Sequence, residues 1–266
     1  MYQFNYQKAK SLGDATAALA KSADARLLAG GQTLIASMKM RLVSPSDLID
    51  LGGIAELRGI KIDGGTLTIG AMTSHADVAS SSEVKKAIPA LARLAGEIGD
   101  RMIRNLGTIG GSVANNDPAA DYPAGLLGLG ATINTNKRKI AADQFFKGMY
   151  ETALEAGEII TSVSFPIPKR AGYAKFKNPA SRYAMVGVFV SEGAGGVRVA
   201  VTGAAPSVFR VPTMEKALTG KFSADAIASI QVPATGLNND LHATAEYRAH
   251  LVTVMAKRAV EQALAA

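Results

Sequence analysis

Several residue types and patterns are missing from this chain, and each absence removes a class of function. Cysteine is absent, so the chain alone can form no disulfide, no thiolate nucleophile and no cysteine-ligated iron–sulfur cluster. No apolar run approaches the roughly 20 residues that cross a bilayer. The first residues, Met1 to Tyr6, lack the charged and apolar regions of a secretory signal. We therefore expect a cytoplasmic protein with no membrane span.

Signature motifs of common enzymes are missing too. The chain has no Gly-x-x-x-x-Gly-Lys-Ser/Thr phosphate-binding loop and no Gly-x-Gly-x-x-Gly dinucleotide fingerprint. It also lacks the Gly-x-Ser-x-Gly turn of many hydrolases. Its histidines, His75, His242 and His250, lie far apart with no carboxylate at metal-ligand spacing, so we interpret them as structural and expect no metal site. No general acid–base pair stands out, so any chemistry is expected to come from a cofactor.

Positive charge is in excess, with 29 Lys and Arg residues against 22 Asp and Glu residues and a formal net charge of +7. The basic residues are scattered, apart from one short run at Lys137–Lys139. Tryptophan is absent, and neither an RNP-like aromatic set nor a helix-turn-helix pattern occurs. We therefore expect no nucleic-acid partner. The charge suits an acidic partner subunit or an anionic ligand.

Two glycine-rich segments stand out from the rest of the chain. The first follows a short strand-like run at Arg26–Ala29, where Gly30 and Gly31 precede a helical pattern over residues 33–40. A strand, a glycine turn and a helix together place backbone N–H groups at a helix N-terminus, where an anion can bind. A tight turn that simply needs glycine is the alternative.

The second glycine-rich segment covers residues 103–121. Gly110 and Gly111 lie between Thr108 and Ser112, which carry small hydroxyl side chains. Glycine has no Cβ, so backbone N–H groups there can come close to phosphate oxygens. Two such segments in one chain favour a ligand with two phosphates.

Two carboxylates close the second segment. Asp121 could bind a ribose or ribityl hydroxyl through a charge-assisted hydrogen bond. It could equally cap the helix that begins at Tyr122 and Pro123. Asp117 precedes a proline, so it is expected in an extended or turn conformation, where it could serve only the turn.

The spacing of apolar residues predicts an α+β protein. We expect a small βαβ unit first, with a helix over residues 14–22 capped by Asp14, and then a mixed α+β region. The proline-rich stretch Pro166–Pro168 is the best candidate for a domain boundary. Three strand-like runs and a long helix follow it, over residues 172–178, 184–191, 196–203 and 243–264.

Together these motifs resemble the FAD-binding medium subunit of the molybdenum hydroxylases, the family of aerobic carbon monoxide dehydrogenase and xanthine dehydrogenase. The matching segments keep their order along nearly the whole chain: residues 29–33 followed by Met38 and Lys39, 103–112, 117–121, 157–160 before Phe165 and Pro166, 173–176 and 245–248. Each segment alone is a weak signal, whereas the ordered set is specific.

The resemblance implies a flavin-binding fold of the vanillyl-alcohol oxidase type. Two α/β subdomains, at residues 1–55 and 56–167, would form this FAD-binding domain. A C-terminal domain at residues 168–266 would follow, with a three-stranded antiparallel sheet and helices.

The resemblance also implies roles for residues. The two glycine segments would hold the FAD pyrophosphate, and Asp121 would bond the sugar-alcohol chain of the flavin. Ile160 and Lys175 would lie near the flavin ring or the adenine, and Tyr183 would lie over the isoalloxazine. The expected cofactor-binding residues are Leu27, Leu28, Ala29, Gly30, Gly31, Gln32, Thr33, Leu106, Thr108, Ile109, Gly110, Gly111, Ser112, Asn115, Asp117, Ala120, Asp121, Ile160, Lys175 and Tyr183.

Partners are implied as well. The family usually forms a heterotrimer or a dimer of heterotrimers, in which a large subunit holds molybdopterin and oxidises the substrate, and a small subunit holds two 2Fe–2S clusters. The medium subunit takes electrons from a cluster onto FAD and passes them to an external acceptor, which can bring the complex to the inner face of the membrane. Alternative readings are a flavin-free scaffold of the same fold and a stand-alone flavin oxidoreductase.

One position departs from the family pattern. Many relatives have an acidic residue just before the aromatic residue of the 180s loop, whereas this chain has Ser181, Arg182 and Tyr183. An arginine near a flavin would favour the anionic reduced form by Coulomb attraction. It could instead point to solvent or to a partner.

Overall fold

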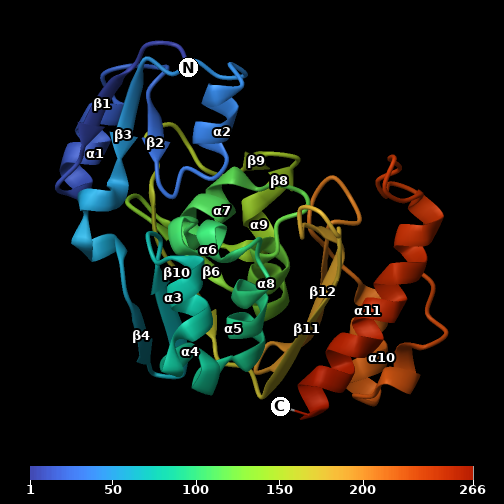
Figure 1. Cartoon of the computed structure of the whole chain (residues 1–266). Helices are drawn as coiled ribbons and strands as arrows, with labels where there is room; N and C mark the ends of the chain where they lie inside the picture. Colours follow the sequence, from blue (N-terminus) through green and yellow to red (C-terminus); the bar gives the residue numbers. More distant parts are fainter. Residues whose placement is uncertain (266) are drawn as a thin grey trace.

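The computed structural model describes residues 1–265 and has three regions that follow one another along the chain (Figure 1). The N-terminal region contains a parallel sheet with the strand order β1-β3-β2. Its strands are β1 (Asn5–Lys8), β2 (Arg26–Leu28) and β3 (Asp47–Asp50). Parallel strands need crossover connections, which α1 (Leu12–Leu19) and α2 (Leu34–Lys39) provide.

The start of α1 differs from the prediction. The Ser11 side chain accepts a hydrogen bond from the backbone N–H of Asp14, so Ser11 is the N-cap and the prediction of Asp14 as the cap is wrong. Asp14 lies in the first turn, where its carboxylate accepts from the Lys10 N–H (3.2 Å). A serine followed three residues later by an acidic side chain is typical of helix starts, and here the acidic side chain bonds the N–H before the cap residue instead of that of Ser11.

The middle region is built on a five-stranded antiparallel sheet with the order β4-β5-β10-β6-β7. Its strands are β4 (Ile60–Asp63), β5 (Thr66–Gly70), β6 (Thr132–Thr135), β7 (Lys139–Ala141) and β10 (Ile160–Pro166). Two 3-10 helices, η1 (Leu51–Gly53) and η2 (Ala55–Leu57), lead into it. A small hairpin of β8 (Phe146–Gly148) and β9 (Glu151–Thr152) lies beside it.

Seven helices belong to this region: α3 (His75–Ser80), α4 (Ser82–Ala87), α5 (Pro89–Gly96), α6 (Arg101–Leu106), α7 (Ile109–Asn115), α8 (Tyr122–Leu129) and α9 (Ala142–Phe145). The second glycine segment is therefore not a loop. Gly110 and Gly111 lie in the first turn of α7, which Thr108 caps.

The C-terminal region is an antiparallel sheet covered by helices. Its strands are β11 (Arg170–Lys177), β12 (Ala184–Gly193), β13 (Gly196–Thr202) and β14 (Phe209–Arg210), in that order. The sheet thus has a fourth strand beyond the three predicted, because two residues are too few to give a periodic signal. The helices are α10 (Pro212–Gly220), η3 (Ala224–Ile227) and α11 (Ala245–Ala265).

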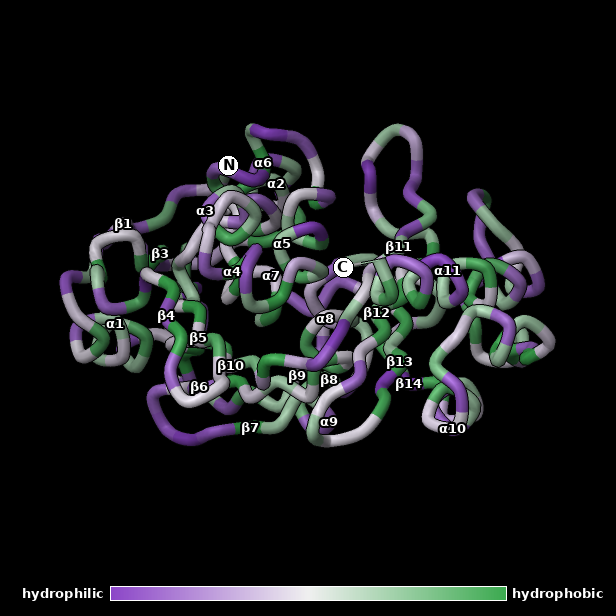
Figure 2. Tube along the Cα trace, turned by 90° about the horizontal axis from the view of Figure 1, so that it is seen from below, coloured by the Kyte–Doolittle hydropathy of each residue, from purple (hydrophilic) through white to green (hydrophobic). Residues whose placement is uncertain are grey.

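The C-terminal sheet is buried on both faces. Along β12, Val186, Val188 and Val190 face the core shared with α10 and α11, while Phe189 faces the core of the middle region. Hydrophobic stretches of β12 and β13 accordingly lie between α8 on one side and α10 and α11 on the other (Figure 2). Tyr173 of β11 joins Phe189 in the middle region's core. The domain boundary at residue 167 stays a prediction, because one hydrophobic core contains residues from both sides of it.

No helix within residues 1–265 has the length and apolarity needed to cross a membrane.

Candidate functional site

A cavity of about 430 Å³ lies where all three regions contribute residues. Its size is in the range of small-molecule binding sites. Most of the predicted residues line it: Leu27, Ala29, Gly30, Gly31, Gln32, Thr33, Thr108, Gly110, Gly111, Ser112, Asn115, Asp117, Ala120, Asp121, Ile160 and Tyr183. Leu28, Leu106, Ile109 and Lys175 do not line it.

The loop between β2 and α2 lines this cavity and has backbone donors without protein acceptors in residues 1–265. Within the described chain, no protein acceptor takes the N–H groups of Gly30, Gly31, Gln32, Thr33 or Leu34. Gly31 has a φ of +70°, a left-handed conformation that favours glycine. Successive N–H groups around a left-handed residue form a concave nest that attracts an anion.

The two glycine segments meet at Gly30. A Cβ on Gly30 would overlap the Leu106 carbonyl oxygen and would come within 2.7 Å of the Gly107 Cα. Leu106 thus supports the first loop from behind, although its own side chain is exposed. Only glycine permits this approach of two backbones, which places the 30–34 loop beside the start of α7.

The N-terminus of α7 differs from what its glycines suggest. The N–H of Ile109 donates to Thr73 O (3.1 Å), that of Gly110 to Ala71 O (2.8 Å) and that of Gly111 to Thr108 Oγ1 (3.2 Å). These amides already have protein acceptors, so they offer no free donors to an anion. A Cβ on Gly110 would lie 2.5 Å from the Ala71 Cβ, so this glycine also serves close packing against the sheet.

What α7 brings to the cavity is therefore a set of small polar side chains. Thr108, Ser112 and Asn115 line it, and Gly111 opens space beside them. A Cβ on Gly111 would meet Thr108 Oγ1 at 3.0 Å and the Ala29 Cβ at 3.4 Å, which small shifts can relieve. Gly111 is thus the glycine of this pair that the protein's own packing requires least.

Asp121 is buried, and a cation and a hydroxyl from the C-terminal sheet hold it. Its Oδ1 accepts hydrogen bonds from Tyr173 Oη and from Lys175 Nζ (2.8 Å). Burial raises the pKa of Asp121, and the charge and hydrogen bond of Lys175 oppose that rise. Asp121 occupies the N-cap position of α8 but makes no side-chain capping bond, so the capping alternative is wrong.

Asp117 serves the turn at the cavity mouth. Its Oδ1 accepts from the Ala119 N–H (2.9 Å), and its Oδ2 accepts from Tyr150 Oη (3.2 Å). Asn116, before it, has a φ of +44° and donates from Nδ2 to the carbonyls of Gly148 and Glu151 at 2.8 Å each. The β8–β9 hairpin is thereby tied to the end of α7.

The 181–183 loop forms another part of the wall. Arg182 has a φ of +63°, and its guanidinium donates to Gly99 O at 3.4 Å. Both residues line the cavity, so Arg182 faces it rather than bulk solvent alone. Tyr183 has a raised pKa, first because of burial and then because of the nearby charges of Asp117 and other groups.

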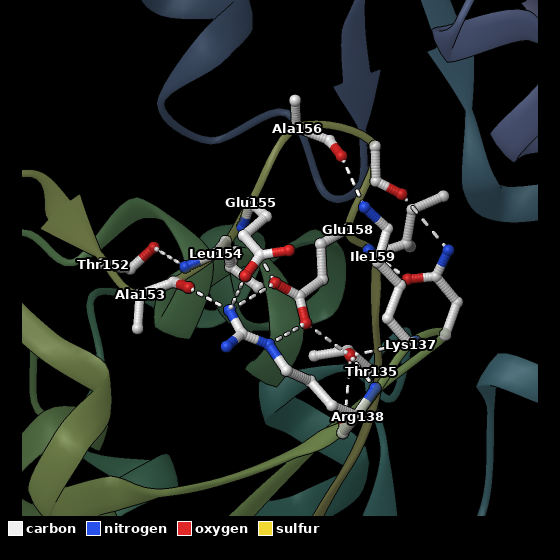
Figure 3. Close-up of polar contacts among 12 residues, drawn as sticks. Thr135, Lys137, Arg138, Thr152, Ala153, Leu154, Glu155, Ala156, Glu158 and Ile159 are labelled. Atoms are coloured by element: carbon white, nitrogen blue, oxygen red, sulfur yellow. Dashed lines mark hydrogen bonds and ion pairs between the residues drawn. The ribbon is translucent and has the colours of Figure 1, made fainter.

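Glu158 lines the cavity and is held by several hydrogen bonds (Figure 3). Its Oε1 accepts from Thr135 Oγ1 (2.8 Å) and Arg138 Nε (3.0 Å), and its Oε2 accepts from Arg138 Nη2 (3.1 Å) and the Glu155 N–H (2.8 Å). These bonds, those from Arg138 first, lower the pKa of Glu158 to about 2. The carboxylate is fully occupied by the protein and fixes the segment 153–159.

Several cavity residues were not predicted as binding residues. They are Arg26, Leu34, Leu51, Ala71, Met72, His75, Ile98, Gly99, Ile103, Gly107, Ala114, Leu154, Glu158, Ile159, Ser181 and Arg182. Most are apolar or glycine residues from separate elements, and outside the matching segments no local pattern marks them. Ile103, Gly107, Glu158 and Ile159 lie inside matching segments whose other residues were chosen, and Leu34 follows the segment 29–33, so a broader choice from these segments could have found them.

His75 was interpreted as a structural residue. It is buried, as such a residue would be, but it also lines the cavity. Burial, with the nearby charge of Arg104, lowers its pKa to about 4, and the imidazole is neutral near pH 7. Within residues 1–265 there is no group of three or more His, Cys, Asp or Glu residues placed to hold a metal ion.

Comparisons with known proteins show the family of the chain. The family described as "FAD binding domain in molybdopterin dehydrogenase" matches residues 2–168, and the "CO dehydrogenase flavoprotein C-terminal domain" matches residues 171–263. The carbon monoxide dehydrogenase medium chain of Hydrogenophaga pseudoflava is 36% identical over 284 residues, covering 99% of this chain and 98% of its own length. The nicotine 6-hydroxylase medium subunit of Paenarthrobacter nicotinovorans is 35% identical, covering 97% and 96%.

Solved structures give the same result. Carbon monoxide dehydrogenase from Hydrogenophaga pseudoflava, in a form lacking the Mo-pyranopterin moiety, matches with a TM-score of 0.89 and 38% identity, covering 99% of this chain and 98% of that one. Quinoline 2-oxidoreductase from Pseudomonas putida 86 matches with a TM-score of 0.90 and 30% identity, covering 98% and 97%. With two family matches that span nearly its whole length, the chain belongs to the FAD-binding medium subunits of the molybdenum hydroxylases, which are components of oxidoreductases.

Proposed function

We propose that this chain holds FAD in the cavity and carries electrons from a 2Fe–2S partner subunit to an external acceptor. The observation that carries the proposal is the loop at residues 30–34, which lines the cavity and whose backbone N–H groups have no protein acceptor within the described chain. They suit a diphosphate. FAD, when bound, supplies redox chemistry that none of the protein's side chains can perform.

The residues present fit FAD along the length of the cavity. Asp121 lines it with Oδ2 unbonded to protein, an acceptor for a hydroxyl of the sugar-alcohol chain. Thr108, Ser112 and Asn115 offer neutral hydrogen-bonding groups next to the diphosphate nest. Ile160 and Tyr183 offer apolar and aromatic surface for the ring systems. Leu28, Leu106, Ile109 and Lys175 support these groups from outside the cavity.

The proposed partners follow from the relatives' assembly as medium chains and medium subunits. A large molybdopterin subunit would oxidise the substrate, and a small subunit with two 2Fe–2S clusters would deliver the electrons, in a dimer of heterotrimers. An excess of positive charge on this chain, +7 in all, favours association with acidic partners.

The test uses the complex co-expressed from the three subunit genes. The purified complex is expected to release one FAD per copy of this chain. Removal of the FAD is expected to leave reduction of the iron–sulfur clusters by substrate intact while stopping transfer to the external acceptor. A complex that holds iron and molybdenum but no flavin would refute the proposal, as would acceptor reduction at full rate after the flavin is removed.

A further inference from the structure

The charged group of Lys175 is bonded within the protein and does not line the cavity. Its side chain is fully buried and does not line the cavity wall. Its Nζ donates to Asp121 Oδ1 at 2.8 Å and to the backbone carbonyl of Glu97 at 2.9 Å. Glu97 is the C-cap of α5, where the helix dipole favours a positive charge.

Tyr173 adds a second donor from the same strand. Its hydroxyl donates to the same oxygen, Oδ1 of Asp121, and its ring lies fully buried 6.1 Å from that of Phe189. Both donors therefore converge on one carboxylate oxygen. The other oxygen, Oδ2, makes no hydrogen bond within the described chain, although Asp121 borders the cavity.

The surrounding backbone is held by the same sheet. Thr202 Oγ1 donates to the carbonyls of Pro118 (3.1 Å) and Ala120 (2.6 Å), and the Ala184 N–H donates to Ala119 O (3.3 Å). The segment that ends in Asp121 is thus fixed by β11, β12 and β13. A carboxylate held at one oxygen on a fixed backbone keeps its other oxygen in a fixed place, which limits the directions from which that oxygen can accept a bond.

We propose that Lys175 and Tyr173 are positioning residues which hold Asp121 by one oxygen so that the other accepts a hydroxyl of the flavin's sugar-alcohol chain, and that this arrangement selects FAD over nucleotides that share only its ADP half. The proposal rests on the proposed function. It gives the buried lysine an indirect role, because a lysine that bound the diphosphate would need its charge on the cavity wall.

The experiment measures the affinity of the flavin-depleted complex for FAD and for ADP. Lys175→Met keeps the volume of the side chain and removes its charge. It is expected to weaken FAD binding by about tenfold or more, the loss of one charge-assisted hydrogen bond, while ADP affinity changes less than about twofold. Lys177→Met, an exposed position on the same strand, is the matched control and should leave both affinities unchanged.

A double-mutant cycle with Asp121→Asn separates positioning from direct contact. If Lys175 acts through Asp121, adding Lys175→Met to Asp121→Asn causes no further loss of FAD affinity. The pH profile gives a second readout. Burial raises the pKa of Asp121 and Lys175 opposes that rise, so removal of Lys175 raises this pKa further, and the FAD affinity of Lys175→Met should rise with pH more steeply than that of the unaltered complex.

Tyr173→Phe carries the test if Lys175→Met does not fold, because it removes one hydroxyl and keeps the buried ring. It is expected to lower the affinity for FAD but not for ADP, and to cause no further loss of FAD affinity when it is added to Asp121→Asn. Additive losses, or equal losses for FAD and ADP, would overturn the positioning role. Failure of the proposed function would look different, because the unaltered complex itself would then bind no FAD.

Discussion

Replacing Glu158 by glutamine should loosen one wall of the cavity and remove part of the fold's sensitivity to acid. The carboxylate accepts four hydrogen bonds, two of them from Arg138. Glutamine has nearly the same shape, but it carries no charge and has one acceptor oxygen instead of two. Some of the donors from Thr135, Arg138 and Glu155 therefore lose their partner.

The size of the expected stability loss follows from the shift in the pKa of Glu158. A fall in the pKa of Glu158 from 4.5 to about 2 corresponds to at most about 3 kcal/mol of folding stability. The Arg138 side chain is 42% exposed, so solvent screens the pair and we expect about 1–2 kcal/mol. For a chain of this size that is a fall of about 2–8 °C in the unfolding temperature.

The sign of the pH dependence is fixed by the direction of the shift. Since the pKa of Glu158 is lower in the folded state, its stabilisation is fully present above the ordinary value of 4.5 and is lost as the pH falls toward 2. The difference in stability between the protein and Glu158→Gln should therefore be largest near neutral pH and should shrink in acid.

The assay is thermal unfolding followed by circular dichroism over a series of pH values. Glu261→Gln, an exposed position with no ion pair in the described chain, is the control and should follow the parent protein throughout. Arg138→Gln should lower the folding stability by a similar amount, and the double variant should lose less stability than the sum of the two single losses. If Glu158→Gln and the parent protein differ by the same amount at every pH, the reasoning fails.

The glycines and Asn116 allow further predictions. Gly111→Glu should abolish flavin binding, measured as FAD per complex, since it adds negative charge beside the diphosphate nest, whereas Gly111→Ala should keep the fold. Gly30→Ala should lower stability by about 1–3 kcal/mol in denaturant unfolding, because its Cβ would overlap the Leu106 backbone, while Gly195→Ala, with open space around it, should stay within about 0.5 kcal/mol. Asn116→Ala should cost about 1–3 kcal/mol in the same assay, since the carbonyls of Gly148 and Glu151 each lose their hydrogen-bond donor, and an unchanged midpoint would show that water replaces it.

The strands and the long C-terminal helix were predictable because their periods are regular over many residues. The pattern placed β12 at residues 184–191, and the structure extends it to Gly193. The helix expected from Ala243 to Leu264 is α11 at Ala245–Ala265. The start of α1 was missed because Ser11 and Asp14 are both good caps, and the structure uses Ser11, with Ala15 and Ala18 buried behind it.

The site was predictable in its residues but less so in its chemistry. Sequence motifs brought Gly30, Gly110 and Asp121 to one place, and the cavity contains all of them. The sequence could not distinguish free amides at 30–34 from the bonded amides of α7, because the acceptors Ala71 and Thr73 come from a distant turn. It also placed Lys175 at the ligand, since a motif does not reveal which way a buried side chain points.

The position of α8 has a consequence for how the chain folds as it is made. All eight of its residues are buried, between the central sheet and the C-terminal sheet. The end of β13, at Thr202, is 73 residues beyond the end of α8 at Leu129. At about 5–20 residues per second, synthesis of that stretch takes roughly 4–15 seconds. During that time α8 lacks the part of its cover that β12 and β13 provide, so apolar surface stays exposed on the half-made chain.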